Sequence, residues 1–164
     1  MDQLRHDFVQ AMSRAAATVS VVTTDGPAGR AGITVSAMTS VSADGDAPTM
    51  LVCVNRGASA AAPILENGVF AINVLRGDQQ ALADLFAGRG DAAGPARFDG
   101  LAWETLATGA PILDGLAVFD CALQAADPIG THHVLIGAVR AVRSADTGAP
   151  LIYGMRSYLR AEPA

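Results

Sequence analysis

The fold is indicated most clearly by residues 32–42, which read GITVSAMTSVS. Successive side chains of a strand point to opposite faces of its sheet. One face then carries Thr34, Ser36, Met38, Ser40 and Ser42, and the other carries Ile33, Val35 and Ala37. The first face is small and hydroxylated, which leaves room for a flat ring to approach the backbone. An ordinary sheet face wetted by solvent would show the same alternation.

Outward from this stretch, short β-rich runs alternate with turn clusters at residues 25–29 and 44–48. We expect strands at 18–23, 31–41, 50–54, 69–75, 117–126, 134–144 and 151–153, and helices at 2–16, 59–66 and 79–86. The close spacing of the strands favours an antiparallel barrel over a sheet built from βαβ units. The sequence therefore predicts one mainly β domain over residues 1–164, with a few short helices.

The charge balance argues against a nucleic-acid partner. The chain has 11 basic and 16 acidic residues, a net charge of −5, and no lysine. No cluster of arginines follows a phosphate backbone, and no apolar run approaches the roughly 20 residues of a membrane span. The charged N-terminus lacks the apolar region of a signal peptide. We expect a cytoplasmic protein that binds neither nucleic acid nor membrane.

Several common catalytic sites find no support in the sequence. The three histidines, His6, His132 and His133, are too few and too clustered to predict a metal site. No G-x-G-x-x-G, phosphate-loop lysine or G-x-S-x-G motif is present. Cys53 and Cys121 lie far apart in apolar runs, which favours buried free thiols.

Three further segments place polar groups where regular elements end. After the run that ends at Val54, the Arg56 guanidinium and a helix beginning at Ser59 suit an anion, although Ser59 is equally explained as a helix N-cap. Gly88 suits the end of the helix at 79–86, or a loop over a cofactor with Arg89 near its anionic end. His132 follows a glycine turn and faces either a pocket mouth or solvent.

Five segments, taken in order and spacing, resemble short-chain members of the flavin reductase-like family. They are residues 23–32, 34–42, 51–59, 119–121 and 130–132, and the resemblance extends over about residues 5–160. It implies an antiparallel split β-barrel of the FMN-binding, Greek-key type. It also implies an NAD(P)H-dependent flavin reductase that reduces FMN or FAD with NADH, with NADPH left open. Such a reductase is a homodimer and supplies reduced flavin to a separate monooxygenase of the 4-hydroxyphenylacetate or pyrimidine type.

The resemblance also assigns site residues. It implies that Thr34, Ser36 and Ala37 line the flavin ring, that Ser40, Val41, Ser42, Asn55, Arg56 and Ser59 contact the rest of the flavin through to its phosphate, and that Phe86, Ala87 and Gly88 border it. His132 and Tyr158 lie where the nicotinamide arrives, and Arg156 is a candidate for that nucleotide's phosphates. His132, the implied catalytic residue, positions or polarises rather than attacks. Many relatives carry several basic residues before the last aromatic residue, whereas this chain carries Arg156 alone there.

Two other functions are compatible with the same barrel. A pyridoxamine-phosphate oxidase-like enzyme would retain FMN tightly and oxidise an amine. A non-catalytic flavin- or haem-binding module would bind its ligand without turnover.

Overall fold

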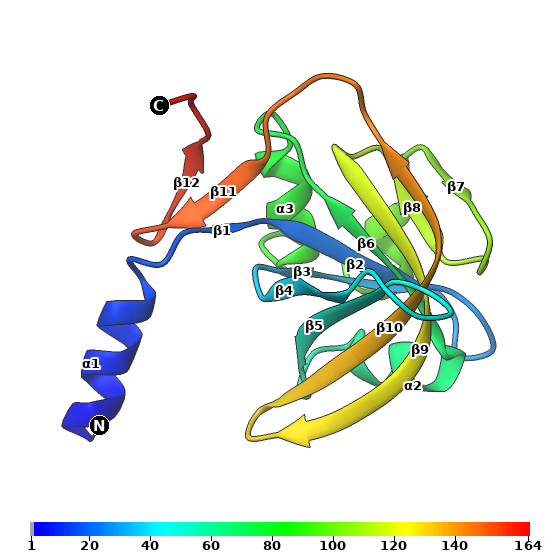
Figure 1. The fold of residues 1–164 in the computed structure, drawn as a ribbon, viewed down its shortest axis with the longest axis horizontal. Helices are drawn as coiled ribbons and strands as arrows, with labels where there is room; N and C mark the ends of the chain where they lie inside the picture. The colour runs from blue at the N-terminus through cyan, green and yellow to red at the C-terminus, as the bar shows by residue number, and fades with distance from the viewer. Residues whose placement is uncertain (1) are drawn as a thin grey trace.

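The segment predicted as one strand over 31–41 forms two strands, which lie at opposite edges of one sheet. In the computed structural model, which describes residues 2–164, the segment consists of β3 (Ala31–Val35) and β4 (Met38–Ser42). The seven-stranded antiparallel sheet has the order β3-β2-β6-β9-β10-β5-β4. Only Ser36 and Ala37 separate its two edge strands in the chain. The sheet must therefore curl until those edges meet, which produces the barrel in Figure 1.

The remaining barrel strands complete the antiparallel order. They are β2 (Ser20–Thr24), β5 (Thr49–Asn55), β6 (Val69–Val74), β9 (Ala117–Ile129) and β10 (His132–Ser144). A smaller sheet contains β1 (Ala17–Thr18), β11 (Leu151–Gly154) and β12 (Ser157–Arg160), and a two-stranded sheet contains β7 (Trp103–Thr105) and β8 (Pro111–Leu113). The predicted mainly β, antiparallel split-barrel fold is confirmed.

The prediction of one strand over 31–41 is wrong, because the chain changes its pairing partner at Ser36. Val35 is the last residue of β3 to pair with β2, opposite Ser20. The Ala37 carbonyl then accepts a hydrogen bond from the Cys53 amide at 2.9 Å, and Met38 pairs with Val52 of β5. Alternation of side chains predicts a strand but not its partner, so the sequence pattern conceals this break.

The helices are shorter than predicted. They are α1 (Gln3–Met12), α2 (Ala61–Asn67) and α3 (Gln80–Phe86), and a 3-10 helix, η1 (Gly94–Phe98), lies in the predicted loop after α3. The expectation that Ser59 caps α2 is wrong, since Ala60 occupies that position and makes no side-chain cap. The strands β7, β8 and β12 were not predicted, because three or four residues are too few to show alternation.

Of the three apolar clusters among residues 2–164, the two with the most buried residues pack on different parts of the barrel. The larger fills the barrel and includes Val52, Phe70 and Leu135. The smaller lies beneath α3 and η1 and includes Phe86 and Phe98. Cys121 belongs to the larger cluster, where burial raises the pKa of its thiol to about 12, whereas Cys53 is half-buried.

Helix α1 contacts the rest of the chain least. Figure 1 shows it standing apart from the barrel, and none of its residues is buried. Its Asp2 N-cap accepts a hydrogen bond from the Leu4 amide. Within residues 2–164, no helix has both the length and the apolar character that a membrane crossing requires.

A buried carboxylate attaches the loop before β8 to the barrel. Asp120 of β9 is completely buried, and its two oxygens accept hydrogen bonds from the amide and the hydroxyl of Thr108. A buried charge is tolerated where such bonds satisfy it. The loop between β7 and β8 is therefore held by one residue that faces the interior.

We predict that Thr108→Val lowers the free energy of unfolding by about 1–3 kcal/mol, because a buried carboxylate oxygen loses its hydroxyl donor. Urea denaturation followed by fluorescence measures the change. Thr105→Val is the matched control, since Thr105 is exposed on β7 of the same hairpin. Equal losses in the two variants would contradict the role of the Asp120–Thr108 contact.

Candidate functional site

Two adjoining hollows share Thr34 of β3 and Ala87, the residue after α3. The first, of about 150 Å³, is also lined by Val19, Val35, Ser36, Arg89, Tyr153 and Tyr158. The second, of about 250 Å³, is also lined by Gly32, Ile33, Ala58, Ser59, Phe86 and Arg97. We call the two together the central groove. It runs from its Tyr158 end, across the strand break, to its Ser59 end.

The floor of the central groove depends on a close approach between β3 and α3. A Cβ atom at Gly32 would lie 2.6 Å from the Phe86 ring, so the ring packs there only because Gly32 has no side chain. Phe86 in turn packs edge-on against Phe98, with 5.0 Å between ring centroids. The Thr34 hydroxyl donates to the Ala83 carbonyl at 2.7 Å, which fixes its direction.

The Ser59 end of the central groove carries a cation that the sequence analysis missed. Arg97 of η1 donates to the Ala92 carbonyl at 3.3 Å and to the Gly32 carbonyl at 3.5 Å. Among the ion pairs of residues 2–164, none includes Arg97. A guanidinium held by backbone carbonyls and beside a serine hydroxyl suits an anionic group such as a phosphate.

The Tyr158 end is built from the C-terminal hairpin and the loop after α3. The Tyr158 and Tyr153 rings meet edge-on, 5.7 Å apart. The Tyr158 hydroxyl donates to Asp84 Oδ1 at 2.7 Å, and Arg89 Nη1 lies 2.9 Å from the same oxygen. Burial, the hydrogen bond to Asp84 and its negative charge raise the pKa of Tyr158 to about 12.

A third hollow, of about 520 Å³, lies at the end of β5 and is lined by Asn55, Arg56, Gly57, Gly130, Thr131 and His133. Arg56 Nη1 donates to the Gly130 carbonyl at 3.3 Å, and Asn55 accepts from the Gly57 amide at 2.8 Å. His133, rather than the predicted His132, lines this hollow, and its Nδ1 atom is buried without a hydrogen-bond partner.

His132 is exposed and lies opposite Asn55 in the β10–β5 ladder. Its Nδ1 atom lies 3.0 Å from the Thr131 hydroxyl. The structure therefore brings His132 beside Asn55 and Arg56, but His132 lines none of the three hollows, and Tyr158 lies in the central groove.

The predicted site residues divide between these regions. The central groove contains Thr34, Ser36, Ser59, Phe86, Ala87 and Tyr158, and the third hollow contains Asn55 and Arg56. Ala37, Gly88 and Arg156 line none of the three hollows, and neither do Ser40, Val41 and Ser42 of the exposed strand β4. Arg156 lies at the tip of the β11–β12 hairpin.

Sequence reasoning missed Arg97, Tyr153 and Gly32 as groove residues, and it placed Arg89 near the anionic end of a cofactor, whereas Arg89 lines the Tyr158 end of the groove. The available signal was the absence of lysine, which makes each arginine near a loop a candidate anion ligand. No pattern in the sequence shows that η1 folds back over β3.

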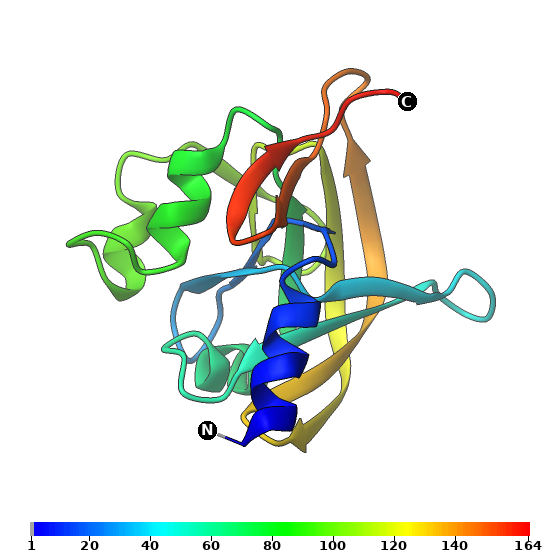
Figure 2. The same ribbon diagram turned by 90° about the vertical axis from the view of Figure 1, so that its left-hand side faces the viewer.

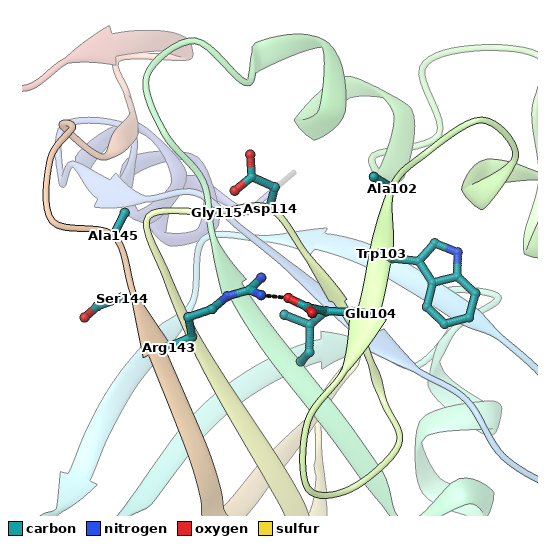
Figure 3. Close-up of a pocket in the computed structure, with 9 residues that line it drawn as sticks. Ala102, Trp103, Glu104, Asp114, Gly115, Arg143, Ser144 and Ala145 are labelled. Atoms are coloured by element: carbon teal, nitrogen blue, oxygen red, sulfur yellow. Dashed lines mark ion pairs between the residues drawn. The ribbon is translucent and has the colours of Figure 1, made fainter.

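A further hollow of about 490 Å³, shown in Figure 3, shares no residue with the central groove. Arg143 of β10 and Glu104 of β7 point toward one another there and form an ion pair, while the Trp103 ring points away. Because these two charges neutralise each other, this hollow lacks the free cation found beside Ser59.

Comparison with known proteins identifies similar chains over nearly the whole length. A family described as flavin reductase like domain matches residues 12–162. The FMN reductase (NADH) RutF of Stutzerimonas stutzeri is 44% identical over 94% of this chain and 87% of its own. BorF, the flavin reductase component of a bacterial two-component tryptophan halogenase, is 34% identical, with a TM-score of 0.86 over 98% and 99% of the two chains.

A second solved structure is equally similar in fold. The Streptomyces globisporus NADH:FAD oxidoreductase SgcE6 superposes with a TM-score of 0.88 over 98% of this chain and 94% of its own, at 26% identity.

We predict that Gly32→Ala costs about 1–3 kcal/mol in free energy of unfolding, because the new methyl group overlaps the buried Phe86 ring. Thermal and urea denaturation measure the loss. Gly77→Ala serves as control, since a Cβ atom there lies 3.8 Å from its nearest neighbour. A Gly32→Ala protein as stable as the control would show that Phe86 does not depend on this close approach.

Proposed function

The chain belongs to the flavin reductase-like family, and from this premise we propose that it uses NADH to reduce FMN, which it then releases to a separate oxygenase. The observation that carries the proposal is the central groove, which is lined by Thr34 and Ser36 at the strand break and by Arg97 at its Ser59 end. The two hollows are joined at Thr34 and Ala87, so one elongated ligand with a ring and a phosphate can occupy both.

The ring portion of the groove fits a flavin. A flavin held there would supply the hydride-acceptor chemistry, and the protein residues would bind and orient it. Thr34, Ser36 and Ala37 border the strand break, where short side chains leave the backbone accessible. Phe86 and Ala87 form the opposite wall. These residues orient the ring and exclude water from one side of it, and orientation of two reactants accounts for much of the rate of such a reaction.

The phosphate portion fits the Ser59 end. We add Arg97 to the predicted ligand Ser59, because both line this end of the groove and Arg97 carries a positive charge. Asn55 and Arg56 line the third hollow and remain predicted ligands at the other end of the same turn. The curated relative named above is an FMN reductase, and SgcE6 is an NADH:FAD oxidoreductase. The higher identity of the former supports FMN as the preferred flavin.

His132, Tyr158 and Arg156 remain our proposed contacts of the nicotinamide nucleotide. Tyr158 borders the ring portion of the groove, where a nicotinamide must stack to deliver its hydride. No proton transfer is required of His132, which acts by positioning the nucleotide.

We also propose a homodimer that buries α1. Leu4, Phe8 and Met12 lie on one face of α1 and are 74%, 63% and 53% exposed. The Met155 amide donates to the Ser13 carbonyl, so α1 leaves the body beside the hairpin that borders the groove. Val41 and Met155, both more than half exposed, add apolar area outside α1. A second copy that covers α1 would thus lie close to the ligand.

The catalytic proposal predicts oxidation of NADH that depends on added flavin. Steady-state absorbance assays should cross FMN, FAD and riboflavin with NADH and NADPH. We expect turnover with NADH, with the lowest flavin KM for FMN. Tight retention of FMN together with amine oxidation would instead support the pyridoxamine-phosphate oxidase-like alternative. Flavin binding without turnover at saturating NADH would support the non-catalytic module.

The phosphate assignment predicts a selective effect of Arg97→Gln. We expect the KM for FMN to rise about tenfold or more, since a charge-assisted hydrogen bond is worth about 1.5–3 kcal/mol. The KM for riboflavin, which has no phosphate, should stay unchanged. Arg140→Gln, at an exposed position of β10, is the control. Equal effects on the two flavins would refute the assignment.

The dimer proposal predicts that Phe8→Glu yields a monomer, because a charge on the apolar face of α1 opposes its burial. Light scattering after size-exclusion chromatography measures the mass. Gln10→Glu introduces the same charge on the other side of α1 and should leave the dimer intact. A wild-type protein that is monomeric at all concentrations would overturn the proposal.

A further inference from the structure

One carboxylate connects two segments at the Tyr158 end of the central groove. Asp84 of α3 accepts the Tyr158 hydroxyl, 74 residues later in the chain, and pairs with Arg89 of the following loop. Both contacts use Oδ1. Tyr158 and Arg89 line the groove, whereas Asp84 does not, so Asp84 acts on a ligand only through these two neighbours.

From this geometry we infer that Asp84 is a positioning residue that fixes the Tyr158 ring and the Arg89 guanidinium where the nicotinamide nucleotide enters, an inference that rests on the proposed function. The β12 strand that carries Tyr158 is an edge strand, paired only with β11 among residues 2–164. The Tyr158 side chain therefore supplies the hydrogen bond between β12 and α3.

The hairpin needs such a fixed point because its turn is strained. Met155 and Arg156 occupy the two central positions of the β11–β12 turn with φ of 50° and 61°. Turns of this kind favour glycine or asparagine, and residues with larger side chains adopt these angles at a cost. The ladder to β1 and the Met155–Ser13 hydrogen bond hold β11 and the turn, but without the contact to Asp84 the Tyr158 side chain would sample other positions.

The two contacts of Asp84 differ in strength. The Arg89 side chain is 60% exposed, and exposed ion pairs contribute little to stability. Asp84 therefore holds Arg89 less tightly than it holds Tyr158. The hydrogen bond to the half-buried Tyr158 is the more persistent contact, and it determines the shape of this end of the groove.

The test compares Asp84→Leu, which removes the acceptor and the charge, with Asp84→Asn, which keeps an oxygen for Tyr158. With riboflavin as flavin, we expect Asp84→Leu to raise the KM for NADH about tenfold with kcat within about twofold, because a lost hydrogen bond of about 1.4 kcal/mol corresponds to that factor. Asp84→Asn should restore part of the affinity. Asp91→Leu is the control, because it removes an exposed carboxylate from the loop that carries Arg89. It should leave the KM for NADH unchanged.

A second measurement reports the contact directly. The chain has two tyrosines, so ultraviolet titration of wild-type protein and of Tyr158→Phe isolates the ionisation of Tyr158. We expect Asp84→Leu to lower the pKa of Tyr158 from about 12, because the hydrogen bond and the charge of Asp84 both raise it. Burial, the largest cause, still keeps the pKa above its ordinary value. Asp84→Leu should also change the KM less in the Tyr158→Phe background than in the wild type.

The outcomes separate the two proposals. Wild-type protein that fails to oxidise NADH with any flavin would overturn the proposed function. Normal wild-type turnover with an unchanged KM in Asp84→Leu would overturn the positioning role alone. So would an additive KM effect in the double variant, or a Tyr158 pKa that Asp84→Leu does not move.

Discussion

The architecture depends on one constraint, the two-residue connection between the edges of a seven-stranded sheet. Because Ser36 and Ala37 alone join β3 to β4, the sheet must curl, and its inner face becomes the large apolar cluster. The same connection interrupts the regular hydrogen-bond ladder at the surface. The central groove lies along this interruption, so the feature that closes the barrel also provides a place for a flat ligand.

The groove acquires its chemistry from the segments that cover the break. Helix α3 supplies Phe86, the 3-10 helix supplies Arg97, and the last hairpin supplies Tyr158. In Figure 2, α3 and the loop after it lie on one side of the barrel, beside the C-terminal hairpin. A protein with a net charge of −5 can thus present a local cation to an anionic ligand, because charge density at a site depends on a few side chains rather than on the total.

Much of the fold could be predicted from the sequence, because alternation and turn residues are local signals. Most of the strands and the order of the helices follow from them. The break at Ser36 could not be predicted, since alternation continues through it while the pairing partner changes. Thr34 and Ser59, which were predicted as flavin contacts, line the central groove. Arg97 in that groove and His133 in the third hollow were not predicted, because their surroundings come from segments distant in the chain.

The short connection at Ser36 and Ala37 also bears on aggregation. Strands at the edge of a sheet recruit strands from other molecules unless they are short, twisted or covered. Here both edges have five residues and are held at one seam. A single proteolytic nick between Ser36 and Ala37 would cut the covalent connection between the two edges and leave each attached through its own ladder, β3 to β2 and β4 to β5. After such a nick, the five-residue length of each edge would be the remaining barrier to recruitment of a foreign strand.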